Sequence, residues 1–174
     1  LRHYVAQDPR PIMQTIDIFP WNEQFSTGIA EIDQQHRRLV DLLNGLASHV
    51  AYRTGSSRLN SLLDELADYA DYHFRTEEGI WHASFGDDPD TIEHRAIHAR
   101  FVATVGQLKA DLRQKPAGDV EREALSFLAR WLASHILETD KEAALAVLAM
   151  RTGLDAPAAR IQARQEMAGA TRAL

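Results

Sequence analysis

Two pairs of metal-capable side chains lie near the middle of the sequence. His73 and Glu77 are four residues apart, and so are His94 and His98. On a helix, this spacing places both members of a pair on one face, about one turn apart. Imidazole and carboxylate groups arranged in this way are typical ligands of a transition metal inside a helical bundle. One such pair on a surface helix is common and usually binds nothing, so the metal hypothesis depends on matching ligands elsewhere.

Composition limits the classes of protein to which the chain can belong. Its 174 residues suffice for one domain with a core, alone or with an appendage. A net charge of -6 and the lack of a basic stretch argue against a nucleic-acid partner. The absence of cysteine excludes disulfides, thiolate metal sites and a cysteine nucleophile. The longest apolar run, residues 143–150, is too short for a membrane segment, and without a signal-peptide pattern the chain is expected to be cytoplasmic.

Four stretches carry apolar residues at spacings of three and four, which predicts four amphipathic helices. Their approximate bounds are 28–53, 58–81, 90–114 and 119–151. Thr27 is expected to cap the first helix, Pro89 to lie in the first turn of the third, and Gly153 to end the fourth. The connections are short and no strand pattern alternates. The sequence therefore predicts an all-α protein, an up-down-up-down four-helix bundle.

The two ends of the chain differ from this bundle. Residues 1–20 contain three prolines and no helical period, which predicts an N-terminal extended arm that Trp21 and Phe25 tie to the core. Residues 21–152 form the predicted bundle. Residues 153–174 predict an extra helical segment, a C-terminal connector with a thin apolar side. This segment could dock back on the bundle or pair with a second copy in a homodimer, and the sequence does not decide between the two.

Every predicted helix carries histidine on its apolar side. A lone inward histidine is usually a satisfied core residue, but here five are joined by two carboxylates. Burying an ionised carboxylate without a partner costs roughly several kcal/mol. A cluster of cations at the point where these side chains meet would remove that cost. The set, in chain order, is His36, His73, Glu77, His94, His98, His135 and Asp140. Three further histidines fall outside this spacing and are expected at the surface: His3, His49 and His82.

In number, type, order and spacing, this set resembles that of the hemerythrin family. The flanking residues agree, because the stretch from Trp21 to His36 resembles the bacterial opening motif of the family, and the stretch from Trp131 to Asp140 resembles its closing motif. The resemblance covers roughly residues 18–150. Ferritin-like diiron proteins use Glu-x-x-His pairs instead, and no such pair occurs here.

The resemblance implies a non-haem diiron site, bridged by an oxo or hydroxo group and by Glu77 and Asp140. It assigns His94, His98 and His135 to one iron. It assigns His36 and His73 to the other, which is left one position short, and an open position is where a small ligand such as dioxygen binds. Hydrolysis at the same metals would require a general base near the open position, and the sequence offers no spare candidate, so the chain is not expected to be an enzyme.

One residue departs from the family pattern. Relatives usually have methionine four residues after the bridging glutamate, and this chain has Trp81. On a helix, Trp81 shares a face with His73 and Glu77, so its indole is expected near the cluster or its access path. Ordinary core packing is one interpretation, and a bulky gate of the ligand pocket is the other.

Three functions compete at this point. The first is an oxygen- or redox-sensing input domain of a larger bacterial signalling protein, joined covalently to a C-terminal output domain that could itself be enzymatic. The second is a free-standing oxygen carrier or store, and the third is a catalytic domain or metal reservoir. The chain starts at Leu1 and ends at Leu174 without a helix-ending signal, so we expect it to be part of a longer protein. Residues 166–174 are similar to the connector of hemerythrin–diguanylate cyclase fusions, which favours the sensor.

Overall fold

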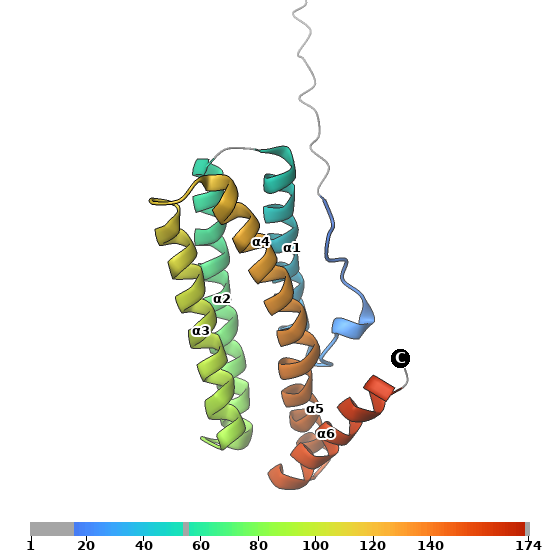
Figure 1. Ribbon diagram of the computed structural model, residues 1–174. Helices are drawn as coiled ribbons and strands as arrows, with labels where there is room; N and C mark the ends of the chain where they lie inside the picture. The colour runs from blue at the N-terminus through green and yellow to red at the C-terminus, as the bar shows by residue number, and fades with distance from the viewer. Residues whose placement is uncertain (1–15, 54–55, 173–174) are drawn as a thin grey trace, which may run out of the picture.

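Four antiparallel helices form a bundle in the computed structural model, which describes residues 16–53 and 56–172 (Figure 1). Each helix contacts its neighbours along the chain, and the fourth closes the bundle against the first. Their bounds are α1 Ala30–Tyr52, α2 Ser56–Phe85, α3 Pro89–Asp111 and α4 Ala117–Ser134. The described residues contain no strand. The predicted all-α bundle is confirmed.

The fourth helix is interrupted where the sequence predicts one continuous helix to about residue 151. Along the chain, α4 is followed by a π-helical segment, η2 (His135–Asp140), and then by α5 (Lys141–Arg151). In a regular α-helix, side chains five residues apart point about 140° away from each other. The i to i+5 hydrogen bonds of a π-helix remove most of that offset, so His135 and Asp140 face the same side. The interruption is what brings both residues to the centre of the bundle.

The helices meet through two separate apolar clusters. The larger one fills most of the bundle and includes the fully buried Leu43, Leu63, Val105 and Val120. The smaller one lies at the end where α1 begins, α2 ends and α5 runs past both. Its buried members are Ile29, Ile32, Trp81, Ala143, Ala144 and Val147. The predicted site residues lie between these two clusters, so apolar packing closes the site from both ends.

The start of α1 differs from the prediction. Its N-cap is Ile29, not Thr27, and Ile29 makes no side-chain cap bond. Thr27 belongs instead to a turn that Asp33 organises, because the Asp33 carboxylate accepts hydrogen bonds from the backbone N–H and hydroxyl of Thr27 and from the Ser26 hydroxyl. Gly28 completes this turn with a φ of 82°, where a side chain would strain the backbone and its Cβ would lie 3.0 Å from Leu148 Cδ1.

The other two helix ends agree with the sequence. Pro89 occupies the first turn of α3, and the Asp88 side chain caps that helix by accepting a hydrogen bond from the Thr91 N–H. Gly153 follows α5 with a φ of 108°, in the region that favours glycine.

The described part of the arm lies along α1. The Asn44 side chain accepts hydrogen bonds from the backbone N–H groups of Ile18 and Phe19. Trp21 and Phe25 pack against the main apolar cluster, with their ring centroids 5.7 Å apart. These two aromatic residues anchor the arm as predicted, while residues 1–15 lie outside the described chain.

A last helix, α6 (Ala156–Arg172), docks on the end of the bundle (Figure 1). Small residues form the contact, where Ala159 and Ala163 of α6 are buried against Ala146 and Ala149 of α5. Of the two alternatives that the sequence leaves open, the structure shows docking. Pairing with a second copy stays a prediction.

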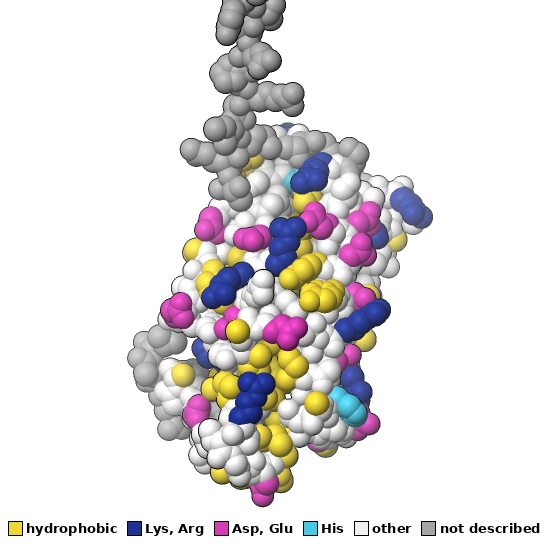
Figure 2. Space-filling model, turned by 180° about the vertical axis from the view of Figure 1, so that it is seen from behind, with side chains coloured by type: hydrophobic (Ala, Val, Ile, Leu, Met, Phe, Trp, Pro, Cys, Tyr) yellow, Lys and Arg dark blue, Asp and Glu magenta, His cyan; other side chains and the backbone are white. Residues whose placement is uncertain are grey.

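The outer surface carries charges of both signs. Basic and acidic side chains are interspersed over the face that Figure 2 shows. Elsewhere along the helices, surface charges of opposite sign pair, for example Arg38 with Glu65 and Arg100 with Glu93. None of the described helices is both long and apolar enough to cross a membrane.

Candidate metal centre

Seven polar side chains converge at the centre of the bundle, and they are the seven that the sequence singles out. All are at least 95% buried. Their ligand atoms form two groups within which all distances are 4.8 Å or less. One group contains His36 and His73, the other contains His94, His98 and His135, and Glu77 and Asp140 belong to both. The seven residues come from α1, α2, α3 and the π-helical segment η2, so the site exists only when these four parts have packed together.

The two carboxylates divide their oxygens between the two groups. Glu77 Oε1 lies 3.5 Å from the Nε2 atoms of both His36 and His73, while Oε2 lies 3.3 Å from His98 Nε2 and 3.7 Å from His94 Nε2.

Asp140 repeats this division on the opposite side of the cluster. Its Oδ2 lies 3.1 Å from His36 Nε2, and its Oδ1 lies 3.1 Å from His94 Nε2 and 3.0 Å from His135 Nε2. Two carboxylates that each offer one oxygen to each histidine group have the arrangement needed to bridge two cations.

The polar atoms of the cluster lack the partners that a buried site normally provides. Both oxygens of Glu77 and Asp140, and Nε2 of His36, His73 and His94, form no regular hydrogen bond. The Nε2 atoms of His98 and His135 approach each other to 2.9 Å. Buried polar groups without partners are costly, and imidazole nitrogens with carboxylate oxygens are a donor set that suits iron and neighbouring transition metals. The residues present therefore fit a pair of such ions.

Charges within the cluster shift its pKa values in opposite directions. Burial lowers the pKa of His36 and of His94, but contact with Asp140 and Glu77 outweighs it and raises both values to about 9. Burial dominates at His73, where it lowers the pKa to about 4, and it also lowers the pKa of His135.

The carboxylates respond to the same neighbours. Burial and mutual repulsion raise the pKa of Glu77, but His73, His36 and His94 outweigh them and hold it well below its usual range. Burial also raises the pKa of Asp140, and His135, His36 and His94 likewise hold it well below the usual range. Because the pKa values of His36 and His94 are raised to about 9, incoming cations must displace a proton from each of these two imidazoles at neutral pH.

Two further polar residues contact the histidines, and the sequence did not predict them. Gln35 Oε1 lies 3.0 Å from His73 Nδ1, and Glu78 Oε1 lies 2.9 Å from His98 Nδ1. Each is the direct neighbour of a predicted ligand in the sequence. Sequence position alone was the only available signal, because the contacts join different helices.

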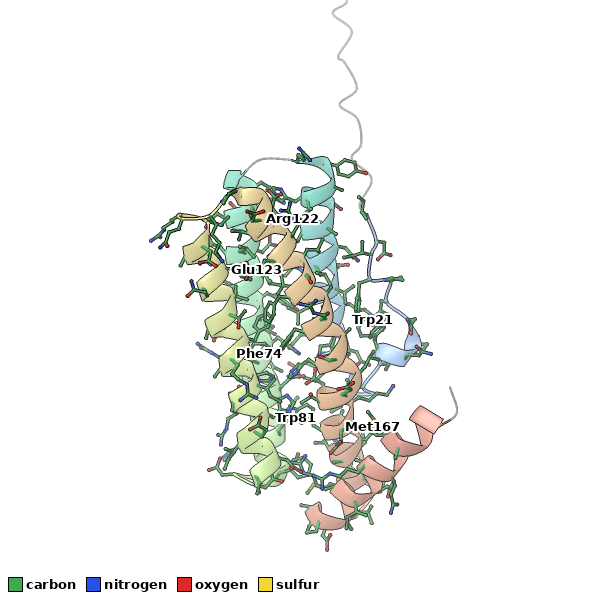
Figure 3. The ribbon with its side chains drawn as sticks, viewed as in Figure 1. Trp21, Phe74, Trp81, Arg122, Glu123 and Met167 are labelled. Carbon is green, nitrogen blue, oxygen red and sulfur yellow. The ribbon has the colours of Figure 1, made fainter. Side chains whose placement is uncertain are left out.

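Aromatic rings surround the histidines. Phe74 stacks on His98 with centroids 3.8 Å apart, and Trp131 stacks on His135 at 4.2 Å. Phe74 and Trp81, labelled in Figure 3, lie on α2 on opposite sides of the cluster.

Trp81 is fully buried in the smaller apolar cluster, and its ring lies 6.0 Å from that of His94. The structure thus places Trp81 near the cluster, beside the three-histidine group.

The histidines outside the ligand spacing have mixed outcomes. His82 is exposed, as predicted, and His3 lies outside the described residues. His49 was expected at the surface, and this prediction is wrong, because its ring is buried and its Nε2 lies 3.3 Å from Glu121 Oε1. The partner comes from α4, so the sequence around His49 could not indicate it.

Comparisons with known proteins agree with this geometry. The family model described as the hemerythrin HHE cation binding domain matches residues 27–145, a range that contains all seven site residues. The bacteriohemerythrin of Stenotrophomonas maltophilia is 34% identical over 123 residues, which cover 70% of this chain and 76% of the relative. The bacteriohemerythrin of Clostridium acetobutylicum is 30% identical over 128 residues, 72% of this chain and 98% of the relative.

The fold has solved counterparts as well. The crystal structure of a leucine-to-tyrosine mutant of hemerythrin superposes with a TM-score of 0.62 at 26% sequence identity. The superposition covers 72% of this chain and 93% of that structure.

Proposed function

The chain belongs to the hemerythrin family, and from this premise we propose that its seven converging side chains hold a non-haem diiron centre that binds dioxygen. A pair of non-haem iron ions with dioxygen as ligand is the cofactor of a hemerythrin domain. The observation that carries the proposal is the division of the Glu77 and Asp140 oxygens between two histidine groups. A single ion would not require it.

Each residue then has a distinct role. Glu77 and Asp140 would bridge the two irons. His94, His98 and His135 would hold one iron, and His36 and His73 would hold the other, where fewer protein ligands would leave room for dioxygen. When bound, the iron pair supplies the electrons for reversible dioxygen binding.

The protein around the irons supports binding without further chemistry. Apolar and aromatic side chains on both sides of the cluster keep water away from it. Among the described carboxylates next to the seven, Glu78 is engaged with His98 and Asp33 with the turn before α1. Neither of these two carboxylates is free to act as a general base.

Metal analysis of paired variants tests the site. We expect purified protein to contain two irons per chain and to develop a visible charge-transfer band when the reduced form meets air. His73→Ala should lose much of the iron, whereas His82→Ala, an exposed histidine of the same helix, should keep it. Full iron occupancy in His73→Ala, or a spectrum without visible bands, would contradict the assignment.

We further propose that the domain is the oxygen- or redox-sensing input of a larger cytoplasmic signalling protein, with α6 leading to a covalent output domain. Two connections from the cluster to α6 support this role. The first is direct, because α5 begins immediately after Asp140 and packs on α6.

The second connection runs through Arg160 of α6, whose side chain is almost fully buried. Its guanidinium lies 3.8 Å above the Phe85 ring and 2.9 Å from Asp88 Oδ2. Asp88 caps α3, the helix that carries His94 and His98. Through these two connections, a change in the position of α5 or of α3 is carried to α6.

A free-standing carrier or store is the second candidate, and one comparison favours it. The match covers 98% of the Clostridium acetobutylicum bacteriohemerythrin, so that relative has little chain beyond the shared domain.

Hydrogen exchange separates the two functions. A sensor should change the protection of α6 amides between the reduced, oxygen-free and the oxygenated, iron-loaded protein. Arg160→Met should abolish that difference, while Arg151→Met, which alters an exposed arginine of α5, should keep it. Identical α6 exchange in both states would contradict the sensor and support the carrier.

A further inference from the structure

We propose that Gln35 is a positioning residue: through a chain of hydrogen bonds anchored on α2, it holds His73 in the tautomer that presents Nε2 to the cluster. The inference deepens the proposed function and rests on it for its metal-binding consequence. The tautomer itself is a property of the metal-free protein and can be measured independently.

The chain of hydrogen bonds starts at a backbone carbonyl. The Thr76 hydroxyl donates to the Tyr72 carbonyl oxygen, 3.1 Å away, so its single hydrogen is already used. Thr76 Oγ1 lies 3.3 Å from Gln35 Nε2 and can therefore only accept there. The Tyr72 hydroxyl lies 3.4 Å from the same nitrogen. These contacts place the NH₂ end of the Gln35 amide on the side of Thr76.

The orientation of the amide decides the tautomer of His73. With its NH₂ towards Thr76, Gln35 turns Oε1 towards His73 Nδ1 at 3.0 Å, and a carbonyl oxygen can only accept. His73 Nδ1 must therefore carry the hydrogen. Its Nε2 then keeps the lone pair, and this atom faces Glu77 in the two-histidine group. The other tautomer would point an N–H at the place where an ion would bind.

The two histidine groups select the Nδ1–H tautomer with different acceptors, an amide in one and a carboxylate in the other. His98 in the three-histidine group faces Glu78, and a carboxylate accepts from either oxygen, so it needs no further support to select the Nδ1–H form. An amide can be turned either way, and Gln35 is selective only because Thr76 fixes it. Gln35 is 4% exposed and its contact with His73 is buried, so water does not compete for that contact. The two-histidine group is thus supported by a neutral acceptor, the Gln35 amide, and the three-histidine group by an anionic one, the Glu78 carboxylate.

The first experiment is nitrogen-15 NMR of the histidine side chains in metal-free protein at neutral pH, with the His73 signals assigned by their loss in His73→Ala. Wild-type His73 should be in the Nδ1–H form. Gln35→Met, which keeps length but removes the acceptor, should give a mixture or the opposite tautomer, and Gln35→Glu, which restores an acceptor, should return the Nδ1–H form. An Nε2–H form in the wild type, or an unchanged tautomer in Gln35→Met, would overturn the proposal.

A second pair of variants avoids any change in the buried residue. Thr76→Val removes the group that orients the Gln35 amide and should increase the fraction of the wrong tautomer. Thr104→Val is the matched control, because Thr104 makes the same bond to the carbonyl four residues earlier, at 2.9 Å to Arg100, away from the cluster. Equal effects of the two substitutions on the His73 tautomer would show that Thr76 does not orient Gln35.

Competition between the protein and a chelator for ferrous iron then measures the consequence. Losing the support of a metal-binding histidine typically weakens metal affinity about 10- to 100-fold, and we expect a loss of that size in Gln35→Met, with recovery in Gln35→Glu. Unchanged affinity in Gln35→Met would overturn the positioning role. If the wild type binds no iron, the proposed function fails, while the tautomer measurement still decides whether Gln35 orients His73.

Discussion

The two histidine groups share the same two carboxylates and differ in almost everything else. His36 and His73 form the smaller group, and three histidines form the larger one. Because Glu77 and Asp140 each offer one oxygen to either side, the carboxylates cannot create the difference between the two proposed irons. The number of histidines creates it. The smaller group has two histidines because α1 and α2 supply one each, whereas the larger has three because α3 supplies two and η2 supplies one.

The surroundings of the two groups differ in the same sense. Rings stack directly on two members of the larger group, with Phe74 on His98 and Trp131 on His135. The smaller group has a polar support in Gln35 and a more distant indole, since the Trp21 ring lies 6.5 Å from that of His36. Each group therefore has a hydrogen-bonding support, Glu78 behind His98 and Gln35 behind His73, and directly stacked rings are added only on the three-histidine side, the closed side. The predictions below test this contrast, from the largest expected effect to the smallest.

Asp140→Asn should have the largest effect, because it alters both groups at once. An amide cannot offer one anionic oxygen to each of two ions, so iron content should fall towards zero, further than in His73→Ala, which removes a ligand of one group only. Iron analysis with a thermal unfolding curve measures this. The core at the other end of the bundle should keep the variant folded.

The matched control is Glu138→Ala, which removes an exposed carboxylate from the same π-helical segment. It should leave the iron content unchanged. Retention of two irons in Asp140→Asn would show that the aspartate does not serve both groups.

The pH dependence of metal binding should show that each group holds one proton. His36 in the smaller group and His94 in the larger have pKa values raised to about 9, whereas those of His73 and His135 are lowered. A raised pKa stabilises the metal-free fold below the unfolded value of about 6.5, and this contribution is lost as the pH rises through about 9. Metal affinity should change in the opposite direction, by up to about tenfold per pH unit for each displaced proton.

Proton release into a weakly buffered indicator solution measures the displacement. At neutral pH the wild type should release about two protons as the metal binds, and His36→Ala about one fewer. The metal-free wild type should also unfold more easily near pH 10 than near pH 6. These two values lie roughly on either side of the window between the unfolded pKa of about 6.5 and the folded pKa of about 9. Equal proton release by wild type and His36→Ala would contradict this division between the groups.

The sequence predicted which residues converge at the candidate site better than the local geometry that aligns them. Spacings of four residues, as in His73 and Glu77, predict a shared helix face directly. The spacing of five between His135 and Asp140 does not, because a regular α-helix would turn the two apart. The π-helical segment that corrects this has no marker in the sequence.

Contacts between helices explain the other differences. His49 was expected at the surface because its neighbours in the sequence give no sign of Glu121, its partner on α4. Gln35 likewise has no evident role until α2 brings Thr76 and His73 to it. Local patterns predict which face of a helix is buried, but the partner of a buried polar group depends on the packing of the whole bundle.

Trp81→Met should give the smallest effect of these substitutions on the iron site. It tests whether the indole beside the three-histidine group only packs or also controls access to the cluster. Replacing the indole leaves space in the smaller apolar cluster and should lower the free energy of unfolding by about 1–3 kcal/mol. If Trp81 is also a gate, the reduced, iron-loaded protein should autoxidise faster in this variant, because water reaches the cluster beside His94. Val147→Ala is the control, since it opens space in the same apolar cluster. Faster autoxidation in Trp81→Met alone supports a gate on the three-histidine side. Equal rates in both variants and the wild type would leave Trp81 as a packing residue.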